Sequence, residues 1–406
     1  MQLSSESHKY MLFLTKNYNQ VDSINFEDTN FKNTIKTLFN DIQNSTLWAN
    51  KMFDSKKIIV NNIDIVSQIP RPDGFNSKWI DAEIKQHIFN NASYKLGYKF
   101  KINNRTIKIT FIIESTDMTI NKDVYKNYII DIMTWISIAD KYSCNNCGKT
   151  LNLYLYMTSL QKVLPKNRWD TISSMEVNSG LSDMCRRESE IIIFRKEEWF
   201  KLLIHETFHN YGLDFSVMNI NVLTDIMKQN FNINSEFLMF ETYTEFWARL
   251  INIVFCTYKI NNTSKFTDFY MYFQVLFYYE RLFSILQCCK ILSFMNLTFD
   301  MITNKKDKDI SLQLYKESTN VFPYYIGVSI LMLDPIKFVT WCGDNNINIF
   351  RFQKTDEKIR SFGNYIVKES NNENNRKIYN KMLKLIPKLK DDLKMSTRMT
   401  ICETKY

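Results

Sequence analysis

Glycine and proline are scarce in this sequence of 406 residues, which contains only 8 glycines and 6 prolines. Both residues interrupt regular structure, and long stretches of the chain alternate apolar and polar residues with helical periodicity. Together these features predict a largely helical protein. Hydrophobic residues make up 45% of the chain, which is enough for a sizeable core and, at this length, for two or three domains.

The sequence also has no long uninterrupted apolar segment. Its N-terminus, MQLSSESHKYMLFLTKNYNQ, lacks an apolar core of the length that a signal peptide requires. The most apolar segment, residues 269–295, contains Glu280, Arg281 and Lys290, so we expect a pair of buried helices there. These features predict an intracellular protein with no signal peptide, no transmembrane segment and no membrane partner.

Without an export signal, the eight cysteines are expected to be reduced thiols. Cys144 and Cys147 form a single C-x-x-C motif. A zinc ribbon needs a second such pair, and the adjacent Cys288 and Cys289 cannot supply it. We therefore interpret the motif as an ordinary loop, with a small zinc or redox site as the alternative.

The net charge of +9 is modest for this length and is spread along the chain. Such a charge is typical of a solvated surface and does not favour a nucleic-acid partner. The sequence has no phosphate-binding loop and no stripe of aromatic and basic residues that would support one.

Along the chain, a mainly helical region over residues 1–104 is followed by strands and then by helices. Alternating or almost wholly apolar segments predict strands over 105–115, at the start of 151–165 and over 188–195. A helix over 196–212 follows the last strand directly, and nearly everything after residue 235 has helical periodicity. This order predicts an α+β protein.

The chain contains only four histidines, and two of them lie in HETFH, residues 205–209. On a helix, His205 and His209 lie one turn apart on the same face, where they can bind one Zn²⁺ at about 2.0–2.1 Å each. Glu206 would then lie beside the metal and take a proton from a zinc-bound water, whose pKa zinc lowers to about 7. The H-E-x-x-H spacing therefore predicts a zinc centre and metallopeptidase chemistry. The alternative is a helix whose two histidines are only packed.

The residues around the motif are consistent with this helix. Glu197 and Glu198 are expected in its first turn, where carboxylates interact favourably with the helix dipole. Gly212 follows its last turn at a position typical of a C-cap. The buried surface is expected to come from the apolar residues Trp199, Leu202, Leu203 and Phe208.

A zinc peptidase needs a third protein ligand. Gly212 lies three residues after His209, as in the metzincin extension, which then requires a ligand at position 215. Phe215 occupies that position and Asp214 lies one residue too early. The metzincin ligand set is therefore excluded.

A later helix, predicted over residues 234–255, offers carboxylates instead. Asn234 or Ser235 is expected to cap it, with Glu236 in its first turn. Glu241 lies 32 residues after the second histidine, and Glu245 follows one helical turn later. One of these two acids can bind zinc while the other accepts the second N–H of a zinc-bound histidine. The alternative is that both are ordinary acids on a helix surface.

Two segments, ESEIIIFRKEEWFKLLIHETFHNYGLDFS and FETYTEFWARLIN, resemble the gluzincin superfamily of H-E-x-x-H…E zinc metallopeptidases. More closely, they resemble uncharacterised metallopeptidase-like proteins of giant DNA viruses, over about residues 105–260. The H-E-x-x-H motif is specific, and the glutamate motif is moderately so. The resemblance implies a two-lobed, zincin-like α+β fold. It has a mainly helical N-terminal region over 1–104, a catalytic domain with a small mixed sheet over 105–260, and a large helical C-terminal region over 261–406.

The resemblance also implies roles for individual residues. The gluzincin pattern E-x-x-x-D/E favours Glu241 as the ligand, whereas EFWA at Glu245 resembles the ligand motif of lethal-factor-like toxin peptidases. A strand before the motif helix, here residues 188–195, is expected to be the sheet edge that pairs with the substrate backbone. A tyrosine is expected to stabilise the oxyanion, and the candidates are Tyr243, Tyr324 and Tyr325.

We therefore expect a zinc-dependent endopeptidase that cleaves a protein or peptide substrate in the cytoplasm, a virus factory or a virion. One alternative is a non-catalytic, zincin-fold structural or virion-associated protein that zinc only staples together. A basic, nucleic-acid-associated protein is a third. Glu206 distinguishes the first two, because a purely structural zinc site does not need a carboxylate beside the metal.

Overall fold

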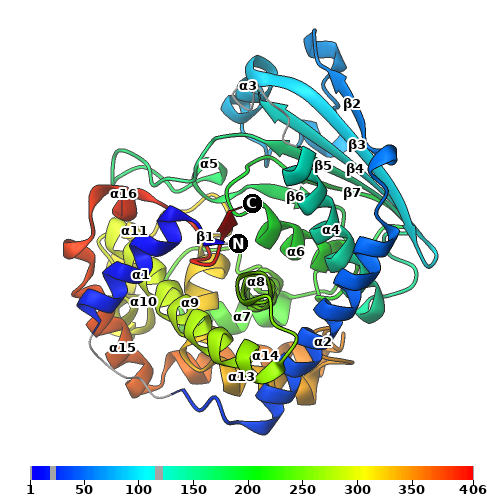
Figure 1. Ribbon diagram of the computed structural model, residues 1–406. Coiled ribbons are helices and arrows are strands. Elements are labelled where there is room, and N and C mark those ends of the chain that lie inside the picture. Colours follow the sequence, from blue (N-terminus) through cyan, green and yellow to red (C-terminus); the bar gives the residue numbers. More distant parts are fainter. Residues whose placement is uncertain (1, 19–23, 115–121, 406) are drawn as a thin grey trace. The chain divides into compact units, whose positions relative to one another are not determined.

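A computed structural model describes residues 2–18, 24–114 and 122–405 (Figure 1). The chain divides into two compact units, each built from discontinuous segments. The sheet unit comprises Lys36–Gln161 and Asn178–Val217, and the helical unit comprises Met1–Ile35, Lys162–Val177 and Met218–Lys405. The predicted divisions at residues 104 and 260 stay a prediction.

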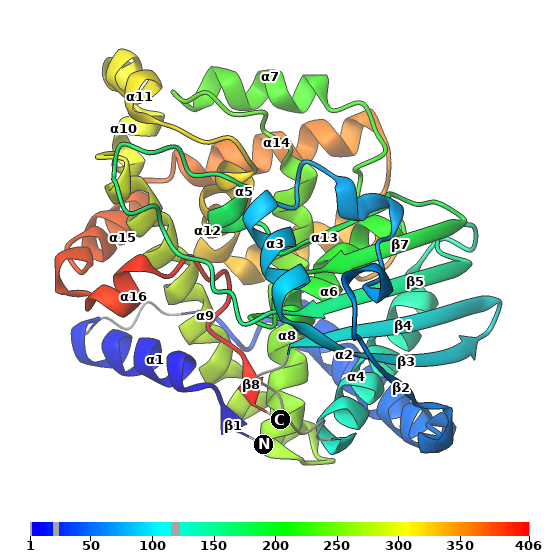
Figure 2. The same cartoon turned by 90° about the horizontal axis from the view of Figure 1, so that it is seen from above.

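The sheet unit contains a mixed sheet of six strands in the order β2-β3-β4-β5-β7-β6. Strands β4, β5 and β7 run parallel to one another, and the remaining neighbours are antiparallel (Figure 2). This confirms the α+β class and the small mixed sheet. The strands are β2 (Ile59–Asn62), β3 (Ala92–Ile102), β4 (Arg105–Glu114), β5 (Thr150–Met157), β6 (Gly180–Ser182) and β7 (Glu188–Ile193).

Three of these strands were predicted, and three were not. Strands β4, β5 and β7 occupy the predicted segments, although residue 115 lies outside the described residues. Strands β2 and β3 lie in the region expected to be mainly helical. In β3 the alternation is present in the sequence, because Leu96, Tyr98 and Phe100 are buried while their neighbours are more exposed.

Three helices of the sheet unit are α3 (Ala82–Asn91), α4 (Lys122–Tyr142) and α6 (Trp199–Asn210), the last of which carries the H-E-x-x-H motif. Every residue of α6 is buried, which confirms the expected burial of its apolar residues. The indole of Trp135 in α4 stacks on Phe208 of α6, with ring centroids 6.3 Å apart. The motif helix is thus packed against α4 in the interior of its unit.

Helix α6 begins later than predicted. Glu198 adopts a left-handed conformation with φ of 57° and acts as the N-cap residue, so Glu197 and Glu198 precede the first turn. At the other end Gly212 has φ of +64°, and its N–H donates to the His209 carbonyl at 3.2 Å. The N–H of Leu213 donates to the Phe208 carbonyl at 2.9 Å. These two bonds form a Schellman cap and confirm the predicted helix end.

The helical unit is built around two long buried helices, α8 (Met239–Asn261) and α9 (Phe266–Phe294). The apolar segment that was predicted to form a helix pair is instead the single helix α9. The three charged residues that interrupt the apolar segment are buried but have partners. Glu280 accepts from the Ile401 N–H at 2.9 Å, Arg281 donates to the Leu333 carbonyl at 3.0 Å, and Lys290 donates to the Leu393 carbonyl at 3.0 Å.

Shorter helices complete this unit, and strands β1 (Gln2–Leu3) and β8 (Thr404–Lys405) pair antiparallel within it. The shorter helices are α1 (Ser5–Asn17), α5 (Ser174–Val177), α7 (Asn221–Asn230), α10 (Phe299–Thr303), α11 (Lys308–Leu314), the π-helix η5 (Phe322–Gly327), α12 (Val328–Leu333), α13 (Pro335–Asn345), α14 (Asp356–Ser370), α15 (Glu373–Leu383) and α16 (Asp391–Met395). Helix α2 (Thr29–Met52) begins in this unit and continues into the sheet unit.

Helix α8 begins at Met239, five residues after the predicted start. Phe237 has φ of 50°, a left-handed conformation that a helix starting at Asn234 could not continue through. Ser235 therefore does not cap α8, and its hydroxyl accepts from the Phe237 N–H at 3.2 Å instead. Glu236 lies before the helix, and Glu241 is the acid in its first turn.

Within the described part of the chain, no single helix has the length and apolar character needed to cross a membrane. One bent pair, Phe322–Leu333 with Pro335–Asn345, passes that test of length and composition only when its two helices are taken together, across a bend of 96°.

The expectation that all eight cysteines are reduced is wrong for two of them. Cys147 forms a disulfide with Cys185, while Cys144 stays a free thiol. Backbone pairing brings the two segments together, because the Gly148 N–H donates to the Arg186 carbonyl at 2.6 Å. The C-x-x-C motif lies in a loop, as predicted, but one of its cysteines is oxidised with a distant partner.

Candidate metal centre

His205 and His209 present their imidazoles to each other on one face of α6. Their Nε2 atoms lie 3.2 Å apart, and both side chains are buried. This separation fits two ligands of one tetrahedral ion bound at about 2.0–2.1 Å from each nitrogen. The helical spacing alone produces the arrangement, since residues four apart lie one above the other.

Asp214 holds the ring of His209 from the opposite side. Its Oδ2 atom contacts Nδ1 of His209, and its Oδ1 atom accepts from the Ser216 hydroxyl at 2.8 Å. A carboxylate on Nδ1 keeps the proton there and leaves Nε2 free to bind a metal. The Schellman cap at Gly212 makes this contact possible, because it turns the chain back toward the helix end.

This role of Asp214 was not predicted from the sequence, where the residue is one position too early for a metzincin ligand. The predicted partners of a zinc-bound histidine were Glu241 and Glu245. The sequence does contain a signal for this contact: Gly212 follows the last turn of the helix, and the acid Asp214 comes two residues later.

Glu206 is tied to the neighbouring strand β6. Its Oε2 atom accepts a hydrogen bond of 2.8 Å from the Ser182 hydroxyl. Gly180, at the start of the same strand, lies so close that an added Cβ would be 2.9 Å from the Ile192 carbonyl oxygen and 3.3 Å from Oε1 of Glu206. Strand and carboxylate therefore pack without an intervening side chain.

Strand β6 is also one edge of the sheet, next to β7. The prediction that residues 188–195 form the edge is wrong, because β7 pairs with β5 on one side and with β6 on the other. The sequence did not reveal β6, since three residues are too few to show an alternating pattern.

The two candidate acids of α8 have different surroundings. The Glu241 side chain accepts a hydrogen bond of 3.2 Å from the Tyr324 hydroxyl. Glu245 forms a fully buried ion pair with Arg249, in which Nε and Oε1 lie 2.9 Å apart. Arg249 in turn donates to the Ser284 hydroxyl at 3.0 Å. Glu245 thus neutralises a buried guanidinium, and Glu241 is the acid that can serve a metal.

The three candidate tyrosines also separate. The hydroxyls of Tyr243 and Tyr325 donate to the carbonyls of Phe350 and Thr397, at 3.0 Å and 2.5 Å, in the interior of the helical unit. The Tyr324 hydroxyl donates to a candidate ligand, Glu241. It lies in the π-helix η5, a rare element that is frequent at functional sites.

A buried glutamate fixes the start of that π-helix. Oε2 of Glu317 accepts from the N–H of Phe322 at 2.8 Å and from the Tyr315 hydroxyl at 2.7 Å. Burial raises the pKa of Glu317 to about 7. The position of η5, and with it that of Tyr324, therefore depends on a carboxyl that titrates near neutral pH.

Among the described residues, the group that could hold a metal ion consists of His205, His209 and Glu241. Two histidines and one glutamate are a ligand set that zinc accepts in catalytic sites. Glu245 is not a member of this group.

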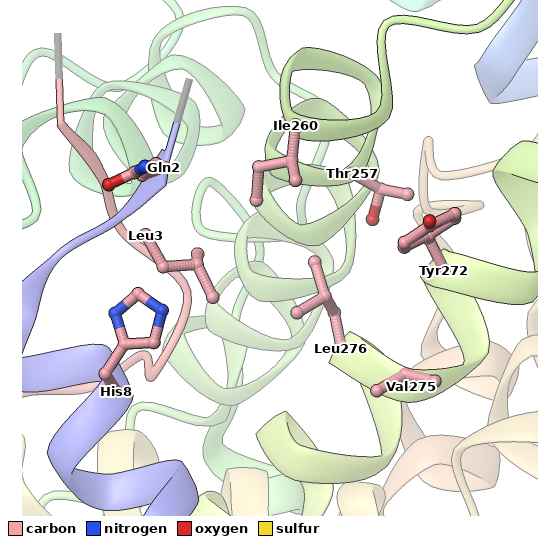
Figure 3. A pocket seen from close by; sticks show the side chains of 8 residues that line it. All are labelled: Gln2, Leu3, His8, Thr257, Ile260, Tyr272, Val275 and Leu276. Carbon is pink, nitrogen blue, oxygen red and sulfur yellow. The ribbon is translucent and has the colours of Figure 1, made fainter.

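The helical unit also contains an apolar pocket of about 510 Å³ (Figure 3). Neither Glu241 nor Glu245 lines it. Residues of β1, α1, α8 and α9 line it, and His8 supplies its only imidazole. The Nδ1 atom of His8 lies 3.0 Å from the Ser4 carbonyl oxygen. No acid or cysteine lines the pocket, so it offers no set of metal ligands.

The chain is similar to a curated protein, the uncharacterized protein R210 of Acanthamoeba polyphaga mimivirus. The two are 26% identical over 245 residues, which cover 55% of this chain and 59% of the mimivirus protein. The similarity thus spans less than two thirds of that relative. No family model and no solved structure matches the chain.

Proposed function

We propose that the protein is a zinc-dependent peptidase in which His205, His209 and Glu241 bind one Zn²⁺. The observation that carries the proposal is the position of Glu206. Glu206 directly follows His205, the first of the two histidines whose imidazoles face each other. Its carboxylate accepts a hydrogen bond from Ser182 in the edge strand β6. A structural zinc site has no use for such a group.

When bound, zinc supplies a Lewis acid that lowers the pKa of a water to about 7 and polarises the scissile carbonyl. Glu206 then acts as general base toward the attacking water and afterwards carries the proton to the leaving amine. Asp214 keeps the imidazole of His209 in the tautomer that binds the metal. Ser182 holds the carboxylate of Glu206 in place.

The substrate is proposed to be a protein or peptide in extended conformation. Among the described strands β6 is at the edge of the sheet, and an extended peptide can add to such an edge. A peptide bound in this way would lie beside the strand from which Ser182 contacts Glu206. Tyr324 is proposed to stabilise the oxyanion, because it is the candidate tyrosine that contacts a ligand of the set.

We further propose that the fold is zincin-like. Three features support this assignment. The mixed sheet ends in the short edge strand β6, the H-E-x-x-H helix α6 follows strand β7 in the chain, and the later helix α8 carries the proposed third ligand.

The test is the metal content of the purified protein. We expect one zinc per chain and a large loss of zinc in His209→Ala. His87→Ala is the matched control, because this histidine also lies in the sheet unit but pairs with Glu114 at 2.6 Å. Full zinc retention in His209→Ala, or loss of zinc in both variants alike, would reject the metal site.

A further inference from the structure

Three cysteines of the sheet unit are connected through one turn and one disulfide. Cys144 and Cys147 lie in the turn after α4, where the Cys147 N–H donates to the Cys144 carbonyl at 3.4 Å. The disulfide joins Cys147 to Cys185, in the turn between β6 and β7. Of the free cysteines in the described part of the chain, Cys144 is the one whose side chain is not buried. A free thiol is therefore three residues from an oxidised one.

A buried arginine holds both cysteines of the turn. The Arg105 guanidinium donates to the Cys144 carbonyl at 2.8 Å and also contacts the Cys147 carbonyl. It pairs with Asp140 at 2.5 Å and lies over the ring of Tyr211, 4.3 Å from its centroid. None of these contacts uses a sulfur atom, so the C-x-x-C turn is maintained whichever partner Cys147 has.

We propose that Cys144, Cys147 and Cys185 form a thiol–disulfide exchange site. The Cys144 thiolate attacks Sγ of Cys147, a Cys144–Cys147 disulfide forms, and Cys185 leaves as a thiolate that takes up the proton lost by Cys144. One S–S bond forms as another breaks, so the step needs no oxidant or reductant. The C-x-x-C spacing is that of redox-active dithiols. The proposal does not depend on the proposed peptidase function.

The exchange would release one end of the β6–β7 hairpin. Cys185 lies three residues after Ser182, and its N–H donates to the His209 carbonyl at 3.2 Å. In the exchanged form this turn loses its covalent link to the segment after α4 and keeps backbone contacts such as that between Gly148 and Arg186. The released hairpin is the one that holds Glu206.

The experiment maps disulfide connectivity in the full chain across a series of reduced to oxidised glutathione ratios. Samples are quenched with acid, alkylated, digested and read by mass spectrometry. We expect the wild type to produce a species with a Cys144–Cys147 bond and an alkylated Cys185. Cys144→Ser should lack this species, whereas Asn145→Ser, an exposed change in the same turn, should produce it as the wild type does.

Cys185→Ser provides a second, independent readout, because it removes the present partner of Cys147 and leaves Cys144 as the neighbouring thiol with which Cys147 can pair. We expect this variant to form the Cys144–Cys147 bond directly, and amide hydrogen exchange over residues 181–187 to be faster in it than in the wild type. The proposal is overturned if the wild type passes straight from the Cys147–Cys185 form to the fully reduced form, or if Cys185→Ser leaves Cys144 and Cys147 as thiols. Neither readout requires peptidase activity, so failure of the proposed function would leave this test intact.

Discussion

The Ser182 hydroxyl, at the end of strand β6, donates a hydrogen bond of 2.8 Å to Oε2 of Glu206. This contact joins the edge of the sheet to the carboxylate proposed as general base. A hydroxyl donor restricts the position of the carboxylate without adding charge to the site. Ser182 is therefore a positioning residue, and its effect should appear in turnover.

We predict that Ser182→Ala lowers kcat by roughly 10- to 100-fold, because a hydrogen bond to a charged group contributes about 1.5–3 kcal/mol. KM and zinc content should stay close to wild type. Ser182→Thr, which keeps the hydroxyl, should recover most of the activity. Steady-state kinetics on a cleaved peptide decides the point, and a change confined to KM would argue against positioning.

For Asp214, the prediction concerns metal affinity. Asp214→Asn removes the charge that supports Nδ1 of His209, and loss of such a partner typically weakens metal binding about 10–100-fold. Asp225→Asn, an exposed change on α7, is the matched control. Competition with a zinc chelator measures both affinities. Equal affinities would mean that Asp214 does not support the ligand.

The two acids of α8 should respond differently to the same substitution. Glu241→Gln is expected to weaken zinc binding by well over the 10–100-fold typical of a supporting residue. Glu245→Gln is expected to keep zinc but to lower the free energy of unfolding by about 3–5 kcal/mol, because Arg249 is left buried without its counter-charge. Chelator competition and urea unfolding separate the two. A reversed pattern would make Glu245 the ligand.

Glu317 should make stability depend on pH. Burial raises the pKa of this carboxyl from 4.5 to about 7, so between these values the folded protein binds its proton more tightly than the unfolded chain does. The stabilisation is complete below about pH 4.5 and is lost as the pH rises to about 7, a change of about 3 kcal/mol.

The comparison of wild type with Glu317→Gln measures this contribution. The free energy of unfolding of the variant should not show the decrease with pH that Glu317 causes in the wild type. The stability of the variant relative to wild type should therefore increase from pH 4.5 to 7. Glu373→Gln, an exposed change at the start of α15, should keep the wild-type slope. Urea unfolding at a series of pH values is the measurement, and parallel curves for wild type and Glu317→Gln would refute the assignment.

The parts of the site that could be predicted from the sequence are those fixed by local geometry. His205, Glu206 and His209 are placed by the period of one helix, and Gly212 by the rule for its end. The same period placed Glu241 and Glu245 one turn apart but could not choose between them. That choice depends on Arg249, whose other partners, the Ser284 hydroxyl and the Tyr324 carbonyl, lie on different helices.

What could not be predicted depends on contacts between segments distant in the sequence. Strand β6 is too short to show a pattern, and only its pairing with β7 reveals it. The disulfide of Cys147 with Cys185 joins residues 38 positions apart, whereas the sequence directs attention to the neighbouring Cys144. The single helix α9 was mistaken for a pair because three buried charges interrupt its apolar run, and each finds a partner on another segment.

The most direct test of the proposed peptidase is cleavage by wild type and Glu206→Gln at equal zinc content. Glutamine keeps the size of the side chain and can still accept from Ser182, but it cannot take a proton. We predict that the variant keeps one zinc per chain and the wild-type fold, and that its rate of peptide cleavage falls by at least about 10²–10⁴-fold. New peptide termini in a peptide library, read by mass spectrometry, measure this rate. Equal cleavage by the two proteins would contradict the role of Glu206, and a zinc-loaded wild type that cleaves nothing would contradict the peptidase itself.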